Sequence, residues 1–235
     1  MEKQAIYELY GSPDSANLVV RMALEVLHQP YRYHAVDRSI QAHKSETYRQ
    51  LNPQGLLPVL VDPDQDAPLF ETAAILLHMS DKHGSLGALP NGPERGRFLK
   101  WLFFLSSTLQ SDLRVSFRPH VYVTDKAGQS ELVSTLGGRV NEHFALLNAE
   151  IEKQQGSFLL GYEVSVLDLL LAACARWAVL YTHGEAAKID HLSALQEMLR
   201  TVEVMPEVAK AAELECLGPT PFTAPRVPDV PGVTD

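Results

Sequence analysis

The hydrophobic pattern of this chain changes after residue 83, and that change constrains the fold more than any other feature. Before it, short apolar runs alternate with amphipathic segments, whereas only helical periodicity continues after it. Residues 84–96 lie between the two parts and contain four glycines and two prolines, a composition typical of linkers. The 235 residues are therefore predicted to divide into an N-terminal domain (1–83), this linker, a helical domain (97–217) and a proline-rich tail (218–235).

The N-terminal domain is predicted to mix strands and helices in the order β-α-β-α-β-β-α. Leu18, Met22 and Val26, for example, recur at the spacing of an amphipathic helix. Strands are expected at residues 5–10, 31–36, 57–61 and 68–70, and helices at residues 18–27, 45–51 and 71–83. A strand–helix–strand unit followed by a hairpin and a helix is the skeleton of the thioredoxin fold. We therefore expect a thioredoxin-like α/β domain.

The C-terminal domain is predicted to be an all-α helical bundle. Apolar stripes of helical period run through residues 98–113 and 132–151. Ser165 and Asp168 form a variant of the capping box before a helix that is apolar on most faces, so this helix is expected in the middle of the bundle. Two further helices are expected at residues 191–204 and 207–215. The tail contains five prolines and is expected to be extended rather than helical.

The composition limits the partners and the compartment of the protein. Lys and Arg number 20 against 29 Asp and Glu, and the net charge of −9 argues against nucleic acid or an anionic membrane as a partner. Cys174 and Cys216 are too few for a disulfide framework and lack the spacing of zinc ligands, which suits a reducing cytosol. Residues 1–5 lack the start of a signal peptide, and the apolar stretch 164–175 is too short to cross a bilayer. We expect a soluble cytoplasmic protein without a metal.

The segment from Asn52 to Leu60, which reads Asn-Pro-Gln-Gly-Leu-Leu-Pro-Val-Leu, carries the strongest functional signal. Pro58 opens a strand but cannot donate a hydrogen bond to the ladder. If the bond before it is cis, the peptide of Leu57 becomes a free edge that an extended peptide could pair with. Glu71 and Thr72 follow at the start of a helix, where backbone N–H groups favour a carboxylate and Glu71 favours an ammonium. A small peptide with both charged groups fits these features.

The pairing of Asn-Pro-x-Gly-x-x-Pro-x-Leu with Glu-(Ser/Thr)-x-Ala-Ile resembles the cytosolic glutathione S-transferase superfamily. The resemblance covers residues 4–215, includes the capping box, and is greatest to bacterial transferases of the theta, beta and nu-like kinds. It implies a thioredoxin-like domain that binds glutathione as co-substrate, an all-α domain that binds a small electrophile, and a cytoplasmic homodimer active in detoxification.

The resemblance assigns glutathione binding to His43, Lys44, Gln54, Leu57, Pro58, Glu71 and Thr72. The backbone of Leu57 resembles the edge that binds the cysteinyl unit, and Glu71 with Thr72 resembles the pair that holds the γ-glutamyl ammonium and carboxylate. His43 lies where relatives contact the glycyl carboxylate. Many relatives have Lys or His directly after the glycine of the motif, whereas this chain has Leu56, so the glycyl end is expected to be held more weakly.

Four residues are candidates for activating the thiol of glutathione. A free thiol has a pKa of about 8.5, and a hydroxyl at a helix N-terminus would lower it. Ser15 is the first candidate and Ser12 the second, although Ser15 could also be only a helix cap. Tyr10 lies where tyrosine-type relatives keep their hydroxyl but could be buried packing, and Asn17 could donate through its amide. No cysteine occupies this region, which argues against a mixed disulfide with the protein.

The expected activity is conjugation of the glutathione thiolate to a small, hydrophobic electrophile. Candidates for its pocket are Phe104, Arg114, Phe117 and Arg118. Two alternatives remain open at this stage. One is a glutathione-dependent disulfide or peroxide reductase, which would use the same thiolate. The other is a non-enzymatic binding protein that retains the fold.

Overall fold

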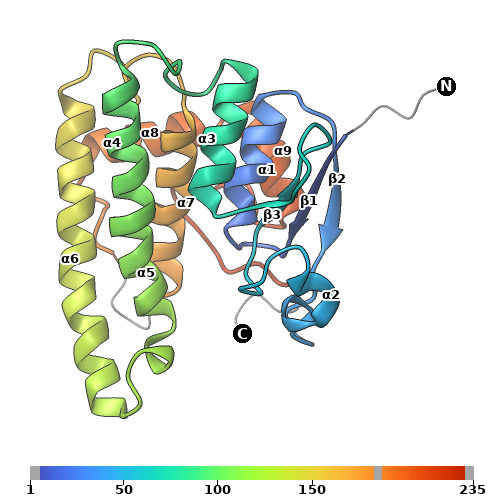
Figure 1. The fold of residues 1–235 in the computed structure, drawn as a ribbon. Helices are drawn as coiled ribbons and strands as arrows, with labels where there is room; N and C mark the ends of the chain where they lie inside the picture. Colours follow the sequence, from blue (N-terminus) through green and yellow to red (C-terminus); the bar gives the residue numbers. More distant parts are fainter. Residues whose placement is uncertain (1–5, 183–186, 231–235) are drawn as a thin grey trace.

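A computed structural model describes residues 6–182 and 187–230 and contains a small α/β domain followed by a helical domain (Figure 1). The sheet has the strand order β2-β1-β3-β4. Its strands are β1 (Tyr7–Gly11), β2 (Tyr31–Ala35), β3 (Val59–Val61) and β4 (Leu69–Phe70). β1 pairs with β2 in parallel, whereas β3 is antiparallel to both β1 and β4. This mixed four-stranded sheet confirms the predicted thioredoxin-like order.

Helices cover both faces of the sheet. The helical segments of this domain are α1 (Asn17–Val26), the 3-10 turn η1 (Ala42–Lys44), α2 (Glu46–Arg49) and α3 (Thr72–His83). Leu9 and Leu60 point into the main core, which also contains the buried face of α1. Val59 points to the other face, where it packs with Tyr48 of α2 in a smaller cluster. The alternation of side chains along each strand thus gives the sheet two buried faces.

Two predicted boundaries differ from the structure. The expected helix at residues 45–51 is a single turn, α2, because η1 precedes it and the chain leaves the helix before the Asn52–Gly55 turn. The expected strand at residues 57–61 starts at Val59, since the Leu57–Pro58 peptide bond is cis and lies outside the ladder. The start of the first strand, expected at Ala5, and the N-terminal residues 1–5 lie outside the described residues.

The second domain is a bundle of helices with α7 at its centre (Figure 1). Its helical segments are α4 (Arg95–Phe104), the π-helical turn η2 (Leu105–Leu109), α5 (Gln110–Phe117), the 3-10 turn η3 (Pro119–Val121), α6 (Lys126–Glu152), α7 (Val166–Leu180), α8 (Ser193–Glu203) and α9 (Pro206–Leu214). α9 leaves the bundle and packs against α1 of the first domain (Figure 1). None of the helices in the described ranges is both long and apolar enough to cross a membrane.

The predicted capping box at the start of α7 is present. The backbone N–H of Leu167 donates to the Ser165 hydroxyl oxygen over 3.3 Å, and the Asp168 carboxylate accepts the Ser165 N–H over 2.9 Å. Asp168 also accepts the N–H of Leu159 over 2.9 Å, which anchors the preceding loop to the helix. These bonds satisfy buried backbone donors that the helix itself cannot pair, so α7 can start inside the core.

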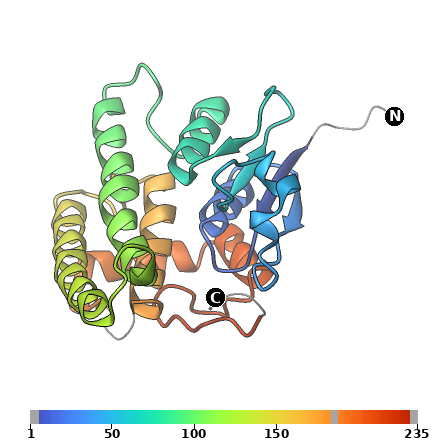
Figure 2. The same ribbon diagram turned by 60° about the horizontal axis from the view of Figure 1, so that its bottom comes forward.

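The proline-rich tail packs against the body of the protein. Residues 218–230 contain no helix, but they turn at residues 221–224 and bury the ring of Phe222. The Glu203 carboxylate accepts the N–H groups of Phe222 and Thr223 over 2.8 and 3.0 Å. Figure 2 shows this segment running along the side of the molecule where the two domains meet.

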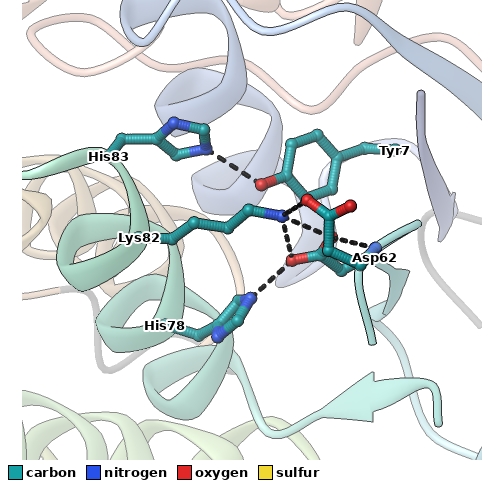
Figure 3. A network of polar contacts seen from close by, with 6 residues as sticks. Tyr7, Asp62, His78, Lys82 and His83 are labelled. Carbon is teal, nitrogen blue, oxygen red and sulfur yellow. Dashed lines mark hydrogen bonds and ion pairs between the residues drawn. The ribbon is translucent and has the colours of Figure 1, made fainter. Parts of the chain in front are cut away.

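A polar network joins α3 to the sheet at the end of β3 (Figure 3). The buried Asp62 carboxylate accepts hydrogen bonds from Lys82 over 2.6 and 2.8 Å and contacts His78 Nε2 over 2.6 Å. Lys82 also donates to Asp64 over 2.7 Å, and the Tyr7 hydroxyl contacts His83 over 2.9 Å. The network thereby fixes the last turns of α3 against β1 and β3.

Candidate functional site

The sheet register brings three separate segments to one end of the first domain. Tyr10 of β1 lies opposite Val59, and Val59 lies opposite Phe70 of β4. The next residues beyond these pairs are Gly11, Pro58 and Glu71, which lie at the same end of the sheet because the neighbouring strands are antiparallel. The loop after β1, the loop before β3 and the start of α3 therefore meet around Pro58.

The predicted free edge before Pro58 has the required geometry. The Leu57–Pro58 bond is cis, Pro58 is buried, and Leu57 is half-buried. Leu57 precedes the first residue of β3, so its peptide lies beyond the strand pairing. An extended ligand could pair with a peptide in this position.

Glu71 and Thr72 lie where the last strand enters α3. Glu71 has φ 71° and ψ 109°, a conformation that turns the chain sharply into the helix, and its side chain is exposed. Thr72 is the first residue of α3 and is buried. Gln54 donates from Nε2 to Glu71 Oε1 over 3.2 Å, so these two predicted residues lie together. The free N–H groups of the first turn make this position suited to a carboxylate.

The loop between β1 and α1 is organised around the side chain of Asn17. Its Oδ1 accepts the backbone N–H of Ser12 over 2.9 Å and the hydroxyl of Ser15. Its Nδ2 donates to Glu215 Oε1 over 2.8 Å, and Asn17 is fully buried. The residue before α1 is Ala16, and no side chain caps this helix, so Ser15 has no capping bond here. Ser15 is only half-buried, which leaves its oxygen as the most accessible of these polar groups.

The Tyr10 hydroxyl is paired within the sheet. Its ring stacks on His34 with a centroid distance of 4.4 Å, and its hydroxyl donates to Glu8 over 3.4 Å. Burial, followed by the charge of Glu8, raises the pKa of Tyr10. Tyr10 and Leu57 pack against the same small cluster of buried side chains, which includes Val59, so the ring lies near the Leu57 side chain while the hydroxyl is bonded to Glu8.

His43 and Lys44 form a basic rim beside the Asn52–Gly55 turn. Lys44 Nζ donates to the carbonyl oxygen of Gly55 over 2.8 Å, and a Cβ on Gly55 would lie 2.7 Å from the carbonyl oxygen of His43. His43 Nδ1 is buried and has no hydrogen-bond partner in residues 6–182 and 187–230. Burial, and then nearby cations, lower the pKa of both side chains, Arg118 acting on each of them.

The four residues predicted for the electrophile pocket do not all lie together. Phe104 packs its ring against Trp101 and His143, inside the helical bundle. Phe117 instead packs edge-on against Tyr181 with a centroid distance of 6.0 Å. The Tyr181 hydroxyl donates to Asp14, next to Ser15 in the chain, so Phe117 lies near the β1–α1 loop. Arg114 lies three residues before Phe117 on α5, Arg118 directly follows the end of that helix, and both arginines are exposed.

Two buried carboxylates hold the β1–α1 loop in place. The sequence analysis did not identify either of them as a site residue. Arg176 of α7 donates to both oxygens of Asp14 over 2.8 and 2.7 Å. Glu215, which follows α9, accepts the N–H of Asp14 over 2.9 Å and lies 3.1 Å from Arg21 Nε. Burial raises the pKa of Glu215 to about 7, although Arg21 opposes that shift. Asp14 and Glu215 lie 201 positions apart, so no local pattern could have revealed this contact.

Among the residues that the structure describes, no group of three or more His, Cys, Asp or Glu side chains could hold a metal ion. Cys174 is buried within α7, and burial raises the pKa of its thiol. The polar groups around Pro58 are instead hydroxyls, amides and carboxylates.

Comparison with known proteins connects this geometry to one family. Residues 9–91 match the family profile described as "Glutathione S-transferase, N-terminal domain". Glutathione S-transferase GstB of Escherichia coli strain K12 is 26% identical over 166 residues, which cover 70% of this chain and 79% of that protein. Glutathione S-transferase GST-4.5 of Xanthomonas campestris is 26% identical over 212 residues, covering 89% of this chain and 99% of that protein.

The fold is also found among solved structures. A glutathione transferase homologue from Sulfitobacter, solved with bound glutathione, aligns with a TM-score of 0.77 and 20% sequence identity. The alignment covers 90% of this chain and 99% of that one. It therefore includes both the α/β domain and the helical domain.

Proposed function

Because this chain belongs to the cytosolic glutathione S-transferase superfamily, we propose that it conjugates the thiolate of glutathione to a small electrophile with a hydrophobic body. The observation that carries the proposal is the meeting of Leu57–cis-Pro58, Glu71–Thr72 and Ser15 at one end of the sheet. The bound glutathione in the Sulfitobacter homologue supports a site for the same peptide here. Homodimerisation and a cytoplasmic location are further parts of the proposal that follow from the family.

Each part of glutathione has a complementary group in this arrangement. The γ-glutamyl carboxylate would accept hydrogen bonds from the first turn of α3 and the Thr72 hydroxyl, while its ammonium would face Glu71. Gln54 orients the Glu71 carboxylate through its 3.2 Å hydrogen bond. The cysteinyl backbone would pair with Leu57. The glycyl carboxylate would lie near His43 and Lys44, while the apolar Leu56 offers it no charge.

Ser15 is proposed to stabilise the thiolate. Its hydroxyl donates to Asn17 Oδ1 in this structure, so its lone pairs can accept a hydrogen bond from the S–H of the thiol. Rotation about the Cβ–Oγ bond would redirect the hydroxyl proton from Asn17 to an ionised sulfur. Asn17 Oδ1 would then keep the 2.9 Å hydrogen bond from the Ser12 N–H, so no buried acceptor is left unpaired.

The test is a titration of glutathione by calorimetry, together with the ultraviolet absorbance of its thiolate as a function of pH. Wild type should bind glutathione and lower the thiol pKa below about 8.5. Ser15→Ala should raise the pKa of the bound thiol by about one unit or more, because one hydrogen bond to a charged group contributes about 1.5–3 kcal/mol. Ser130→Ala, an exposed hydroxyl on α6, is the matched control.

The outcomes separate the alternatives. A thiol pKa that changes in Ser12→Ala but not in Ser15→Ala would transfer the role to Ser12. Binding without a lowered thiol pKa would argue for a carrier. A folded protein that binds no glutathione would contradict the proposal and favour a non-enzymatic protein that retains the fold.

A further inference from the structure

We propose that the electrophile carries a carboxylate, which Arg114 and Arg118 bind while Phe117 packs against its apolar body. This inference rests on the proposed transferase function and adds the chemical class of the second substrate.

Two of these side chains share one face of α5, and the third follows directly after the helix. Arg114 and Phe117 are three residues apart, the spacing that places side chains side by side on a helix, whereas Arg118 has left the helical conformation with φ −136° and ψ 57°. The Phe117 ring contacts Tyr181, whose hydroxyl donates to Asp14. This face is therefore turned toward the β1–α1 loop and the proposed thiolate position beside Ser15.

The charges opposite this face are also positive. Lys44 is held against the Asn52–Gly55 turn by its hydrogen bonds to the carbonyl oxygens of Gly55 and Gln54, 2.8 and 3.4 Å long. Burial, followed by the charges of Arg49, Arg118 and Arg114, lowers the pKa of Lys44. A cationic region that spans both domains is unusual in a chain with a net charge of −9. It attracts anions and orients them as they enter.

Arg114 differs from the arginines on α4, α6, α7 and α8 in its contacts with carboxylates. The arginines on α4, α6, α7 and α8 each contact a carboxylate: Arg95, Arg97, Arg139, Arg176 and Arg200. Arg114 is exposed and forms no hydrogen bond or ion pair with any residue of the described ranges. An arginine without an internal carboxylate can form a bidentate pair with the carboxylate of a ligand.

Glutathione alone does not account for these charges. Its glycyl carboxylate is assigned to His43 and Lys44 on the first domain, whereas Arg114 and Arg118 belong to the second domain, beside an apolar ring. The aromatic or alkyl body of the electrophile would pack on Phe117, with its carboxylate toward the arginines. The opposite, reactive end of the electrophile would then point toward the sulfur of glutathione. The carboxylate would orient the electrophile and take no part in bond formation.

The experiment compares two electrophiles that differ only in the carboxylate, benzyl chloride and 4-(chloromethyl)benzoate. In both, the thiolate sulfur forms a bond to the benzylic carbon while the carbon–chlorine bond breaks and chloride leaves. The measured quantity is the ratio of kcat/KM for the carboxylate to kcat/KM for the neutral compound, at saturating glutathione. We expect wild type to prefer the carboxylate and Arg114→Gln to lower the ratio about tenfold, the loss of one charge-assisted pair.

Two further variants sharpen the comparison. Arg114→Glu places a negative charge on the same helix face and should lower the ratio more than Arg114→Gln does. Arg200→Gln removes an exposed arginine of α8 and should keep the wild-type ratio. A preference for the neutral compound in wild type, or an unchanged ratio in both Arg114 variants, would overturn the inference alone. Turnover of neither compound would overturn the transferase function on which it rests.

Discussion

Asn17 shows how much of this site depends on a single side chain. Its oxygen accepts hydrogen bonds from Ser12 and Ser15, and its nitrogen donates to Glu215. A carboxylate can only accept, so Glu215 fixes the amide with its nitrogen inward and its oxygen toward the serines. The orientation of the Ser15 hydroxyl is therefore set by a residue that never reaches the proposed site.

Gly11 tests this dependence, because it leaves the space that the Asn17 side chain fills. A Cβ on Gly11 would lie 2.3 Å from Asn17 Cγ, which requires a displacement of the amide. Gly11→Ala should lower the free energy of unfolding by about 1–3 kcal/mol, the usual cost of overpacking. It should also raise the pKa of the bound thiol, because the displaced amide no longer holds the Ser12 N–H and the loop that positions Ser15. Urea unfolding and thiolate titration measure the two effects.

Gly138→Ala is the control for that substitution. Gly138 lies on the exposed face of α6, where a Cβ would meet nothing within 4 Å. This change should leave the thiol pKa unchanged and raise helix stability by up to about 1 kcal/mol. If Gly11→Ala and Gly138→Ala gave the same thiol pKa, the orientation of Asn17 would have no influence on Ser15.

The sequence predicts the parts of the site that are local and misses those that are not. Glu71, Thr72 and Leu57 could be proposed from the sequence because each stands beside a strand end or a helix start with a recognisable motif. Asp14 carries no motif that identifies it as a site residue, and Glu215 is only the last residue of a predicted helix. Their pairing with Arg176 and Asn17 depends on how two domains pack, which no periodicity encodes.

At the scale of elements, strands and helices followed the apolar periodicity closely, and the differences arose from hydrogen bonding. The turn at η2 joins α4 to α5 without a break in the apolar stripe, so its π-helical geometry leaves no sequence signal. The network around Asp62 was not predicted either, since its partners His78 and Lys82 lie on the polar face of α3 (Figure 3).

Asp62 makes the attachment of α3 dependent on pH. Burial alone would raise the pKa of its carboxyl, but hydrogen bonds from His78 and Lys82 outweigh burial and hold the pKa below its ordinary value. A pKa that is lower in the folded state contributes stability at pH values above about 4, and this contribution is lost as the pH falls through the folded pKa. Acidification should therefore loosen the end of α3.

Asp62→Asn should lower the free energy of unfolding at neutral pH by about 1–3 kcal/mol, because Lys82 loses its buried partner. The difference from wild type should narrow as the pH falls from about 4 through the folded pKa of Asp62, below which the carboxyl is protonated in both states. Asp64→Asn is the matched control: its carboxylate contacts the same lysine but is 71% exposed, so its effect should stay below about 1 kcal/mol. A constant difference between Asp62→Asn and wild type at all pH values would contradict this account.

At the scale of the whole molecule, the two domains are joined through buried charges as well as through apolar packing. Asp14 and Arg176 pair with no exposure of either side chain, and Glu215 pairs with Arg21 in the same way. Arg176 also donates to the carbonyl oxygens of Pro221 and Arg226, so the tail is part of this interface. The predicted tail had no assigned role, because its prolines indicate conformation and not contacts.

Glu215 gives this interface a measurable pH dependence. Its pKa rises from 4.5 to about 7 on folding, chiefly through burial. A raised pKa in the folded state contributes stability that is complete below the unfolded pKa and is lost as the pH rises through about 7. The free energy of unfolding of wild type should therefore contain a component that falls between about pH 5 and pH 8.

Glu215→Gln should remove that component. The glutamine can still accept the Asn17 Nδ2 hydrogen bond, but its own nitrogen opposes the N–H of Asp14, so the variant is expected to be less stable than wild type at acidic pH. The decisive quantity is the slope between about pH 5 and pH 8, which should be flatter in the variant whatever its absolute stability. Glu213→Gln changes an exposed residue in the last turn of α9 and should retain the wild-type slope. Equal slopes in wild type and Glu215→Gln would show that the buried carboxylate stays charged throughout, with Arg21 compensating its burial completely.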